Sequence, residues 1–333
     1  MVVYRLIARF FMKVSVLGCG RWGSFISWYL AGSNHAVTEW GRGDGRSFKE
    51  LKENGKNEYV ELDERICLTS DLKLAVETAE VIVISIKSQS LREFSREIAE
   101  FGAKEKKIVL CMKGLEENTG KRLTEIMLEE GYDKDKTAVW VGPGHIQEFT
   151  RGKPNCMVID GYNGDLVREL ADGFKSKLIR FYYGEDIIGS EVGAAAKNVM
   201  GIAAGILDGG GLCTLKGPLM ARGAREISRL IKAMGGNELS AYGLCHLGDY
   251  ETTLFSQYSN NRLYGEDLYL KKPFTKLAEG VSTTKALKLL GEKYGVDLPI
   301  SNAVYKIIFE NGEPLDELLK LFERKTVEEF TSR

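Results

Sequence analysis

The chain has 333 residues, of which 44% are hydrophobic and 28% charged, a composition typical of a folded globular protein with room for two domains. Its 46 Lys and Arg residues nearly balance its 47 Asp and Glu residues, so no overall charge favours nucleic acid or an anionic membrane as a partner. No run approaches the roughly 18 consecutive apolar residues of a membrane span. The six cysteines are far apart and show no metal-binding spacing, which indicates reduced thiols, a cytoplasmic location and no metal site.

The first eleven residues, MVVYRLIARFF, are apolar and basic but have no small-residue cleavage site before the first strand pattern. They therefore lack a defining feature of a signal peptide. Met12 is an alternative natural start, in which case residues 1–11 are an N-terminal extension. The sequence leaves this choice open.

A glycine-rich turn follows the first predicted strand, Lys13 to Leu17, and precedes a helical pattern. Gly18, Gly20 and Gly23 have the spacing G-x-G-x-x-G. Between a strand and a helix, the first glycine permits a tight turn, the second lets a pyrophosphate approach the backbone, and the third lets the helix pack closely on the strand. The helix N-terminus supplies the positive end of a dipole for the phosphates. The sequence therefore predicts a dinucleotide site.

The residues after the second predicted strand, Ala36 to Trp40, bear on the choice of cofactor. An acidic residue there hydrogen-bonds a ribose hydroxyl of NAD, whereas a basic residue accepts the 2′-phosphate of NADP. Arg42 and Arg46 follow the strand, and Glu39 lies slightly too early. The pattern favours NADP over NAD, with arginines on a solvated loop as the alternative.

Continuous apolar segments alternate with helical patterns through the first half of the chain. The strand segments lie at 81–86, 108–112, 138–141, 157–159 and 178–183, and the helical patterns lie at 90–101 and 123–131. Such strands predict a parallel, doubly wound sheet of the Rossmann type. Beyond Ile188 only helical patterns continue, so we predict a dinucleotide-binding domain over 12–188 and an all-helical substrate and catalytic domain over 189–333.

The stretch from Glu191 to Gly211, EVGAAAKNVMGIAAGILDGGG, is apolar on every side and rich in small residues. We expect a central, buried helix, because a surface helix needs only one apolar stripe. Lys197 in its middle loses solvation, which lowers a lysine pKa toward the range of proton exchange at neutral pH. The alternative is a lysine that extends its ammonium group to the surface.

Other candidate side chains follow strands or lie in the helical half. Lys113 ends an apolar strand and either meets an anionic ligand or lies on a solvated loop. His145 and His246 are candidates for a histidine base, although a buried, hydrogen-bonded histidine is the commoner case, and we interpret His35 as structural. The absence of G-x-S-x-G and H-E-x-x-H motifs removes the usual support for a hydrolase or a metalloenzyme.

A polar stretch, CHLGDYETTLFSQYSNNRLYG at 245–265, separates two helical patterns. It could cap a helix and do nothing more. It could equally bind a phosphorylated, hydroxylated substrate, with Asp249 pairing the buried lysine and Ser259 and Asn261 meeting phosphate oxygens. Both interpretations remain open from composition.

Taken together, these motifs resemble the NAD(P)-dependent glycerol-3-phosphate dehydrogenase family from about Lys13 to Phe322. The helical half carries the most specific likeness, in the family's lysine-asparagine helix, its G-D-L-x-x-T segment and its closing helices. The matching segments are GCGRWG, MKGLEENTG, GPGHIQE, GAAAKNVMGIAAGILDG, CHLGDYETT and AEGVSTTKALKLLGEKYGVDLPISNAVYKII. Their order and spacing agree with the family throughout.

The resemblance implies a reversible reduction of dihydroxyacetone phosphate to sn-glycerol 3-phosphate that supplies glycerophospholipid synthesis, and a homodimer. It implies that Lys197 exchanges the proton at the substrate C2 oxygen, with Asn198 and Asp249 around it and Lys113 in contact with substrate. The further substrate residues that it implies are Gly142, Gly144, Thr253, Ser259, Asn260 and Asn261. The cofactor residues that it implies are Gly18, Gly20, Arg21, Trp22, Gly23, Arg42, Lys113, Ile146, Asn260, Leu277 and Glu279.

The sequence departs from the family at two places where substrate is expected. The family pattern S-R-N-R reads Ser259-Asn260-Asn261-Arg262, so Asn260 replaces an arginine. Loss of a bidentate cation weakens phosphate binding unless Arg262, Lys216 or Arg222 takes its place. In GPGHIQE, Gly144 replaces a small hydroxyl residue and His145 an aromatic one. These departures leave two alternatives, a dehydrogenase for another phosphorylated or acidic 2-hydroxy compound, and a non-catalytic nucleotide-binding regulator.

Overall fold

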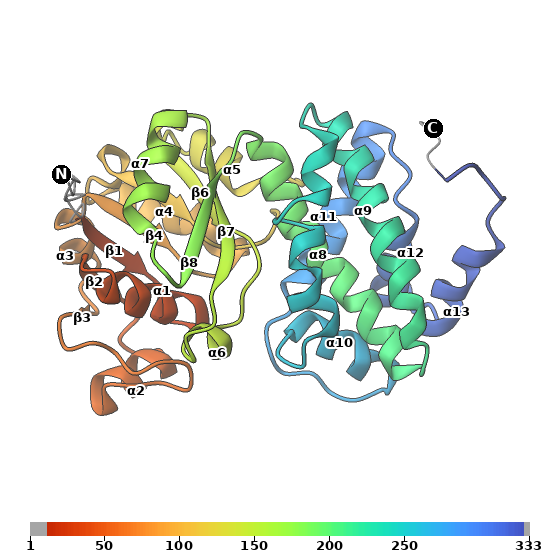
Figure 1. Ribbon diagram of the computed structural model, residues 1–333, viewed down its shortest axis with the longest axis horizontal. Helices are drawn as coiled ribbons and strands as arrows, with labels where there is room; N and C mark the ends of the chain where they lie inside the picture. The colour runs from red at the N-terminus through yellow and green to blue at the C-terminus, as the bar shows by residue number, and fades with distance from the viewer. Residues whose placement is uncertain (1–11, 330–333) are drawn as a thin grey trace, which may run out of the picture. The chain divides into compact units, whose positions relative to one another are not determined.

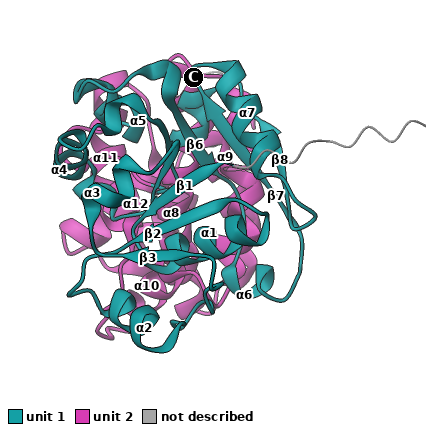
Figure 2. Ribbon diagram, turned by 90° about the vertical axis from the view of Figure 1, so that its left-hand side faces the viewer, with its two compact units in different colours: residues 1–113, 121–191 teal, residues 114–120, 192–333 magenta. Residues whose placement is uncertain are grey.

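The computed structural model describes residues 12–329, so the predicted extension at 1–11 lies outside the described residues (Figure 1). The chain divides into two compact units. Unit 1 comprises Met1–Lys113 and Lys121–Glu191, and unit 2 comprises Gly114–Gly120 and Val192–Arg333 (Figure 2). We describe each unit by itself. Within the described part of the chain, no helix is both long and apolar enough to cross a membrane.

Unit 1 is built on an eight-stranded sheet in the order β3-β2-β1-β4-β5-β6-β7-β8, counted over residues 12–329. The strands are β1 (Lys13–Leu17), β2 (Ala36–Trp40), β3 (Cys67–Thr69), β4 (Val81–Ile84), β5 (Lys107–Leu110), β6 (Thr137–Val141), β7 (Asn155–Gly161) and β8 (Ile179–Tyr183). The central strands are buried along their length because helices cover both faces, which explains their continuous apolar sequences. This confirms the predicted Rossmann-type class.

One part of the sheet prediction was wrong. Strands β1 to β6 pair in parallel, but β7 pairs with β6 in the antiparallel sense, with Val141 opposite Val158. The connection between them holds only the four-residue helix α6 (Ile146–Phe149). An antiparallel pair needs no crossover helix, and a short connection therefore reverses the chain direction. The buried strand residues alone do not reveal this reversal.

The remaining helices of unit 1 cover the sheet. They are α1 (Arg21–Gly32), α2 (Arg46–Asn54), α3 (Leu72–Glu77), α4 (Leu91–Ala99), α5 (Leu123–Glu129) and α7 (Gly164–Phe174). The sequence-based expectations did not include β3, α2, α3 and α7, of which β3 and α3 are short. A large aromatic group anchors the core, in which Phe25 of α1 stacks on Phe149 at 5.0 Å and Trp140 of β6 on Phe174 at 5.6 Å between ring centroids.

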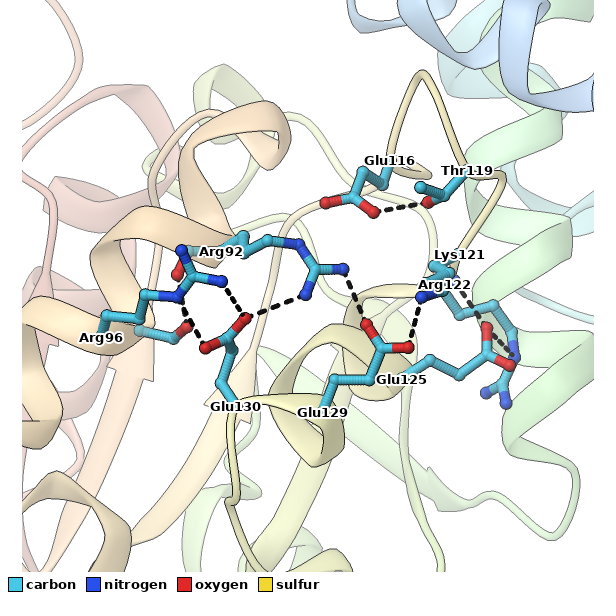
Figure 3. Close-up of polar contacts among 10 residues, drawn as sticks. Arg92, Arg96, Glu116, Thr119, Lys121, Arg122, Glu125, Glu129 and Glu130 are labelled. Atoms are coloured by element: carbon cyan, nitrogen blue, oxygen red, sulfur yellow. Dashed lines mark hydrogen bonds and ion pairs between the residues drawn. The ribbon is translucent and has the colours of Figure 1, made fainter.

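Ion pairs join α4 to α5 on the surface of unit 1 (Figure 3). Arg92 reaches both Glu129 and Glu130 at 2.9 Å, and Arg96 Nε lies 2.7 Å from Glu130 Oε2. The hydrogen bonds from Arg96 lower the pKa of Glu130 to about 2. Because these groups are largely solvated, their contribution to stability is modest, and the apolar faces of the two helices contribute more.

Unit 2 is helical. Its elements are the greater part of α8 (Ile187–Gly209), then α9 (Lys216–Ala233), α10 (Asn260–Tyr269), α11 (Glu279–Tyr294), α12 (Pro299–Phe309) and α13 (Pro314–Leu319). The prediction of a central, buried helix is confirmed for α8, whose residues from Ser190 to Leu207 are all buried. No β-strand follows β8 in the described chain.

Two glycines let α8 and α10 approach closely. A Cβ atom at Gly205 would lie 1.9 Å from the carbonyl oxygen of Arg262, and a Cβ atom at Gly265 would lie 2.0 Å from that of Ile202. Neither backbone could yield by that much, so each helix presents a glycine where the other crosses it. The small residues of the long apolar stretch therefore serve helix packing.

The N-terminus of α12 is capped by a carboxylate from α9. Glu226 accepts hydrogen bonds from the Ile300 N–H at 2.7 Å and from the Ser301 N–H at 3.0 Å, together with the Ser301 hydroxyl at 2.6 Å. Such a cap satisfies backbone donors that a helix start leaves open. The segment Gly114–Gly120 also belongs to this unit, in which Glu117 pairs with Lys285 of α11.

Candidate active site

The glycine turn of unit 1 has the geometry expected of a phosphate-binding loop. Gly18 has φ +117°, a conformation that favours glycine, and a Cβ atom there would lie 2.2 Å from the carbonyl oxygen of Ser85. A Cβ atom at Gly23 would lie 1.6 Å from the carbonyl oxygen of Gly18, so this glycine lets α1 pack on the turn. A Cβ atom at Gly20 would meet nothing within 4 Å. The space beside Gly20 is therefore open to a ligand.

The start of α1 fits a pyrophosphate. Gly20 is its N-cap and offers no side-chain acceptor to the first N–H groups, so these backbone donors can bind phosphate oxygens. Trp22 lies in the first turn of the same helix, and Arg21 precedes it. Partial burial lowers the pKa of Arg21, which nevertheless stays a cation. These residues fit a nicotinamide dinucleotide.

The exposed loop after β2 carries one acidic side chain, Asp44, beside its cations. Arg42 is exposed, and Arg46 forms an ion pair with Glu50 at 2.7 Å. Glu39 is fully buried within β2, between Val16 of β1 and Leu68 of β3 in the strand register. Its burial raises the pKa of Glu39 to about 7. Glu39 therefore belongs to the interior of the unit and does not occupy the ribose-binding position.

The carboxyl ends of β5 and β6 bring Lys113 to the Gly142 loop. Lys113 Nζ donates to the carbonyl oxygen of Gly142 at 2.5 Å and lies 5.9 Å from the ring centroid of Trp22. Gly142 has φ +128°, which favours glycine. The lysine ammonium, the Trp22 ring and the Gly142 backbone thus converge in unit 1.

The departure at Gly144 has a local packing cause. A Cβ atom at Gly144 would lie 2.3 Å from Cε2 of Phe149, so any larger residue there requires the Phe149 ring to move. His145 is buried at the N-cap of α6, and Ile146 begins that helix with its side chain in the hydrophobic core. Ile146 could therefore meet a cofactor only through its backbone.

The buried lysine of α8 is paired in unit 2. Lys197 Nζ lies 2.8 Å from Asp249 Oδ2 and donates to Thr253 Oγ1 at 2.7 Å. The Lys197 side chain is 9% exposed and that of Asp249 is 1% exposed, so the ammonium does not extend to bulk solvent. Asp249 lies in a 3₁₀ turn (Leu247–Asp249) and Thr253 in a π-turn (Glu251–Phe255), a form often found at functional sites.

A glycine again allows this approach. One turn after the lysine, a Cβ atom at Gly201 would lie 2.9 Å from Cγ2 of Thr253 and 3.3 Å from Cβ of Asn261. Asn261 Nδ2 donates to Asn198 Oδ1 at 2.9 Å, and the Gly280 N–H donates to Asn261 Oδ1 at 2.9 Å. Asn198 and Asn261 are thus joined next to the Lys197 pair, as parts of one constellation in unit 2.

The residues that precede and follow α10 surround this constellation. The Ser259 hydroxyl accepts from the Arg262 N–H at 3.3 Å, so the predicted helix cap is present. Asn260 Nδ2 donates to the carbonyl oxygen of Leu277 at 3.1 Å, two residues before Glu279 begins α11. The Asn260 amide therefore binds the loop that carries Leu277, whereas an arginine at this position would offer a cation.

The cations that could replace that arginine are engaged elsewhere. Lys216 and Arg262 both pair with Asp208, at 2.6 Å and 2.7 Å. Arg222 donates to the carbonyl oxygen of Glu329 at 3.2 Å. The Asp208 cluster was not anticipated from sequence, because its members come from three separate helices. Its carboxylate compensates two positive charges that would otherwise lie near α10.

Two features indicate a dinucleotide-dependent dehydrogenase. Unit 1 has a glycine loop suited to phosphate on a Rossmann-type sheet, and unit 2 has a buried lysine-carboxylate pair. No group of three or more His, Cys, Asp or Glu side chains suited to a metal occurs among residues 12–329. The glycine loop and the Rossmann-type sheet together indicate an oxidoreductase that uses a dinucleotide.

Comparisons with known proteins specify the family. The family models described as the N-terminus and the C-terminus of NAD-dependent glycerol-3-phosphate dehydrogenase match residues 13–166 and 186–319. The glycerol-3-phosphate dehydrogenase (NAD(P)+) of Thermoanaerobacter sp. strain X514 is 35% identical over 324 residues, 94% of this chain and 97% of that protein. The protein of the same name from Prosthecochloris aestuarii is 35% identical over 326 residues, 94% and 98% of the two chains.

A solved structure agrees with these matches. The crystal structure of glycerol-3-phosphate dehydrogenase from Coxiella burnetii is similar with a TM-score of 0.86 at 25% identity, covering 94% of this chain and 99% of that one. The chain belongs to the NAD(P)-dependent glycerol-3-phosphate dehydrogenase family.

Proposed function

We propose that this chain catalyses the reversible, NAD(P)H-dependent reduction of dihydroxyacetone phosphate to sn-glycerol 3-phosphate, with Lys197 exchanging the proton. The observation that carries the proposal is the buried Lys197–Asp249 pair at 2.8 Å, in a chain that belongs to this family. The bound nicotinamide supplies a hydride to the ketone carbon, or takes one from the alcohol carbon in the reverse direction. The chain's own residues manage the charge that develops on the oxygen.

Lys197 acts on the C2 oxygen of the substrate. When the ketone is reduced, negative charge builds on this oxygen, and a cationic ammonium both stabilises that charge and donates the proton. In the reverse direction the neutral amine accepts the same proton. Asp249 compensates the charge of the buried ammonium, and Thr253 accepts a hydrogen bond from it, so the position of the ammonium group is fixed.

The other residues bind and orient substrate and cofactor. In unit 2, Asn198, Ser259 and Asn261 are polar groups for the substrate and its phosphate, and Asn260, Leu277 and Glu279 contribute to the cofactor site. In unit 1, Lys113 and the backbone at Gly142 and Gly144 contact the substrate. The glycine loop with Arg21, Trp22, Arg42 and the Ile146 backbone holds the dinucleotide.

We favour NADP over NAD as the preferred cofactor. Arg42 is exposed on the loop and the carboxylate of Glu39 is buried inside the sheet, so a 2′-phosphate would meet the Arg42 cation and not the Glu39 carboxylate, with Asp44 two residues further along the loop. The ratio of kcat/KM for NADPH and NADH tests this preference. Arg42→Ala should reduce the ratio, and an unchanged ratio would show that Arg42 does not contact the 2′-phosphate.

A related substrate is the second candidate, because of Asn260. Its amide donates to the Leu277 carbonyl oxygen where the family arginine would offer a cation, and Lys216 and Arg262 pair with Asp208. A dehydrogenase for a different phosphorylated or acidic 2-hydroxy compound would fit this arrangement. A higher kcat/KM for such a compound than for dihydroxyacetone phosphate would favour this candidate.

The decisive experiment follows NADPH and NADH oxidation with dihydroxyacetone phosphate. We expect turnover that Lys197→Ala abolishes, and undetectable turnover with both nicotinamides would refute the proposal. We further propose a cytoplasmic homodimer that supplies glycerophospholipid synthesis. Light scattering of the purified protein tests the dimer, and loss of glycerophospholipid in a strain without the gene tests the supply.

A further inference from the structure

A buried histidine and tyrosine adjoin the Lys197–Asp249 pair, and the proposed chemistry gives neither a role. His246 and Tyr250 are each 0% exposed. His246 Nδ1 lies 2.9 Å from the carbonyl oxygen of Gly193, and its Nε2 lies 2.6 Å from the Tyr250 hydroxyl. A carbonyl oxygen can only accept, so Nδ1 carries the proton and Nε2 accepts from the tyrosine.

This arrangement fixes a neutral imidazole. Burial lowers the pKa of His246 to about 4. Both ring nitrogens are occupied by groups of the protein, so His246 is not the general base that the sequence analysis considered. Its ring holds the Gly193 carbonyl oxygen on one side and the Tyr250 hydroxyl on the other.

One ring nitrogen and the backbone carbonyl of His246 contact the segments that carry Lys197 and Asp249. Gly193 precedes Lys197 by four residues in α8, so its carbonyl oxygen is the one to which the Lys197 N–H donates in an α-helix. On the other side, the Asp249 N–H donates to the carbonyl oxygen of His246 at 3.0 Å. A Cβ atom at Gly193 would lie 3.1 Å from the His246 Cβ, so glycine lets the histidine approach the helix.

Tyr250 supports the histidine from the opposite side. A Cβ atom at Gly223 of α9 would lie 3.0 Å from the tyrosine hydroxyl and 2.8 Å from Sδ of Met200, so the ring is tightly enclosed. Tyr250 also immediately precedes the π-turn that carries Thr253. The tyrosine therefore joins α9 to the two turns that supply Asp249 and Thr253.

We propose that His246 is a positioning residue for the Lys197–Asp249 pair, and that the Tyr250 hydroxyl holds His246 in the tautomer this task requires. Only the expected change in kcat rests on the proposed function. His246 touches neither substrate nor cofactor in this scheme. Its effect on the reaction is transmitted through the Gly193 carbonyl and the Asp249 backbone.

The test uses three substitutions that separate the two hydrogen bonds. In His246→Asn the amide nitrogen takes the place of Nδ1 and can still donate to the Gly193 carbonyl oxygen. In His246→Gln the amide lies near the position of Nε2, so the hydrogen bond to Gly193 is lost. His246→Ala loses both. We expect kcat to fall about 10- to 100-fold in the Ala and Gln variants, since a small misplacement of a catalytic group costs this much, and the Asn variant to recover most of the loss. KM for substrate and cofactor should change less than about twofold.

The matched control is His35→Asn in unit 1. His35 is also buried and bonds backbone atoms, with Nε2 3.0 Å from the carbonyl oxygen of Gly173, but it holds no catalytic residue. This variant should lose stability without losing kcat. If His246→Ala and His246→Gln retain kcat within twofold, the proposal is wrong. An Asn variant as impaired as the Ala variant would also overturn it, since the Gly193 bond would then be irrelevant.

Two further measurements keep the proposal testable if His246→Ala fails to fold or if the proposed substrate is wrong. Tyr250→Phe removes one oxygen and should lower kcat severalfold, and an unchanged kcat would contradict the role given to the hydroxyl. Crystal structures of the wild type and of the folded His246 variants report the distance from Lys197 Nζ to Asp249 Oδ2 directly. A distance that stays at 2.8 Å in His246→Gln would refute the proposal whatever the substrate.

Discussion

The glycine loop of unit 1 and the lysine helix of unit 2 use glycine for different ends. At Gly20 the missing side chain leaves space for a ligand beside exposed backbone donors, whereas at Gly205 and Gly265 it leaves space for another helix. In the proposed function the glycine loop of unit 1 binds through backbone atoms, whereas the lysine helix of unit 2 acts through side chains that close packing brings together. Substitutions in the two units should accordingly change different measured quantities.

The largest effect is expected at Lys197. Lys197→Met removes the proton donor and should lower kcat roughly 10³-fold or more, while the Kd of NADPH, measured by fluorescence titration, changes little because the glycine loop is intact. The variant also leaves Asp249 buried without its cation, which costs about 3–5 kcal/mol of stability. The double variant Lys197→Met/Asp249→Asn should recover stability but not activity. A comparable loss of NADPH affinity in either variant would contradict this separation of roles.

The next largest effect is a pH dependence of the free energy of unfolding, caused by a buried carboxyl group in unit 1. Burial raises the pKa of Glu39 from 4.5 to about 7, so the folded state binds a proton that the unfolded state has released between these pH values. Stability therefore falls as pH rises through this window, by on the order of 3 kcal/mol for this group. Glu39→Gln should remove this part of the slope and leave NADPH affinity unchanged.

Urea denaturation between pH 4.5 and 8 measures the slope. Glu226 of unit 2 provides the contrast, since burial also raises its pKa to about 7 but its carboxylate caps α12. Glu226→Gln should flatten the slope and also cost stability, because the amide has a single acceptor oxygen whereas the Ile300 and Ser301 N–H groups donate to different oxygens of Glu226. Equal slopes in the wild type and in Glu39→Gln would show that Glu39 is ionised throughout.

A change of similar free energy, but in the affinity for NADPH, is expected at the glycine loop. Gly20→Ala places a methyl group in the open space beside the N-terminus of α1 and displaces phosphate from backbone donors. Loss of one charge-assisted hydrogen bond costs about 1.5–3 kcal/mol, so the Kd of NADPH should rise about 10- to 100-fold. The thermal midpoint of the apoprotein should hardly change, because no protein atom lies within 4 Å of the new methyl group. A destabilised apoprotein with normal affinity would reverse the interpretation.

The helix crossing of unit 2 should respond in the opposite way. Gly265→Ala forces a Cβ atom to within 2.0 Å of the Ile202 carbonyl oxygen and should cost about 1–3 kcal/mol through overpacking, with a lower kcat where α8 shifts. Gly217→Ala in α9 is the matched control, since its Cβ atom meets nothing within 4 Å. That control should be neutral or stabilising by up to about 1 kcal/mol. Urea denaturation of both variants distinguishes close packing from helix propensity.

The same contrast explains how far the sequence could be interpreted. The glycine loop is contiguous, so its strand, turn and helix followed from local spacing, and the buried α8 followed from its uniformly apolar residues. The partners of Lys197 are 52 and 56 residues further along the chain, at Asp249 and Thr253, and no periodicity connects such positions. Family resemblance proposed them, and the structure brings them together.

Other features were missed because they depend on packing. The reversal of β7 depends on a connection whose direction the buried strand residues do not encode. The Asp208 cluster joins three separate helices, and the bond from Tyr250 to His246 closes a single 3₁₀ turn. The preference for glycine at 144 depends on where the Phe149 ring lies. In each case the relevant distance exists only once the chain has folded.

The smallest effect concerns Asn260, the position at which the family pattern has an arginine. Asn260→Arg adds a guanidinium that can bind phosphate in bidentate fashion, and we expect KM for dihydroxyacetone phosphate to fall about tenfold with little change in kcat. The substitution also removes the bond from Asn260 to the Leu277 carbonyl, so Asn260→Ala is the control for that loss alone. An unchanged KM in the arginine variant would mean that another cation already compensates for the missing arginine. A KM that falls equally for a non-phosphorylated ketone would instead point to a change in the loop, and would favour a substrate without a phosphate group.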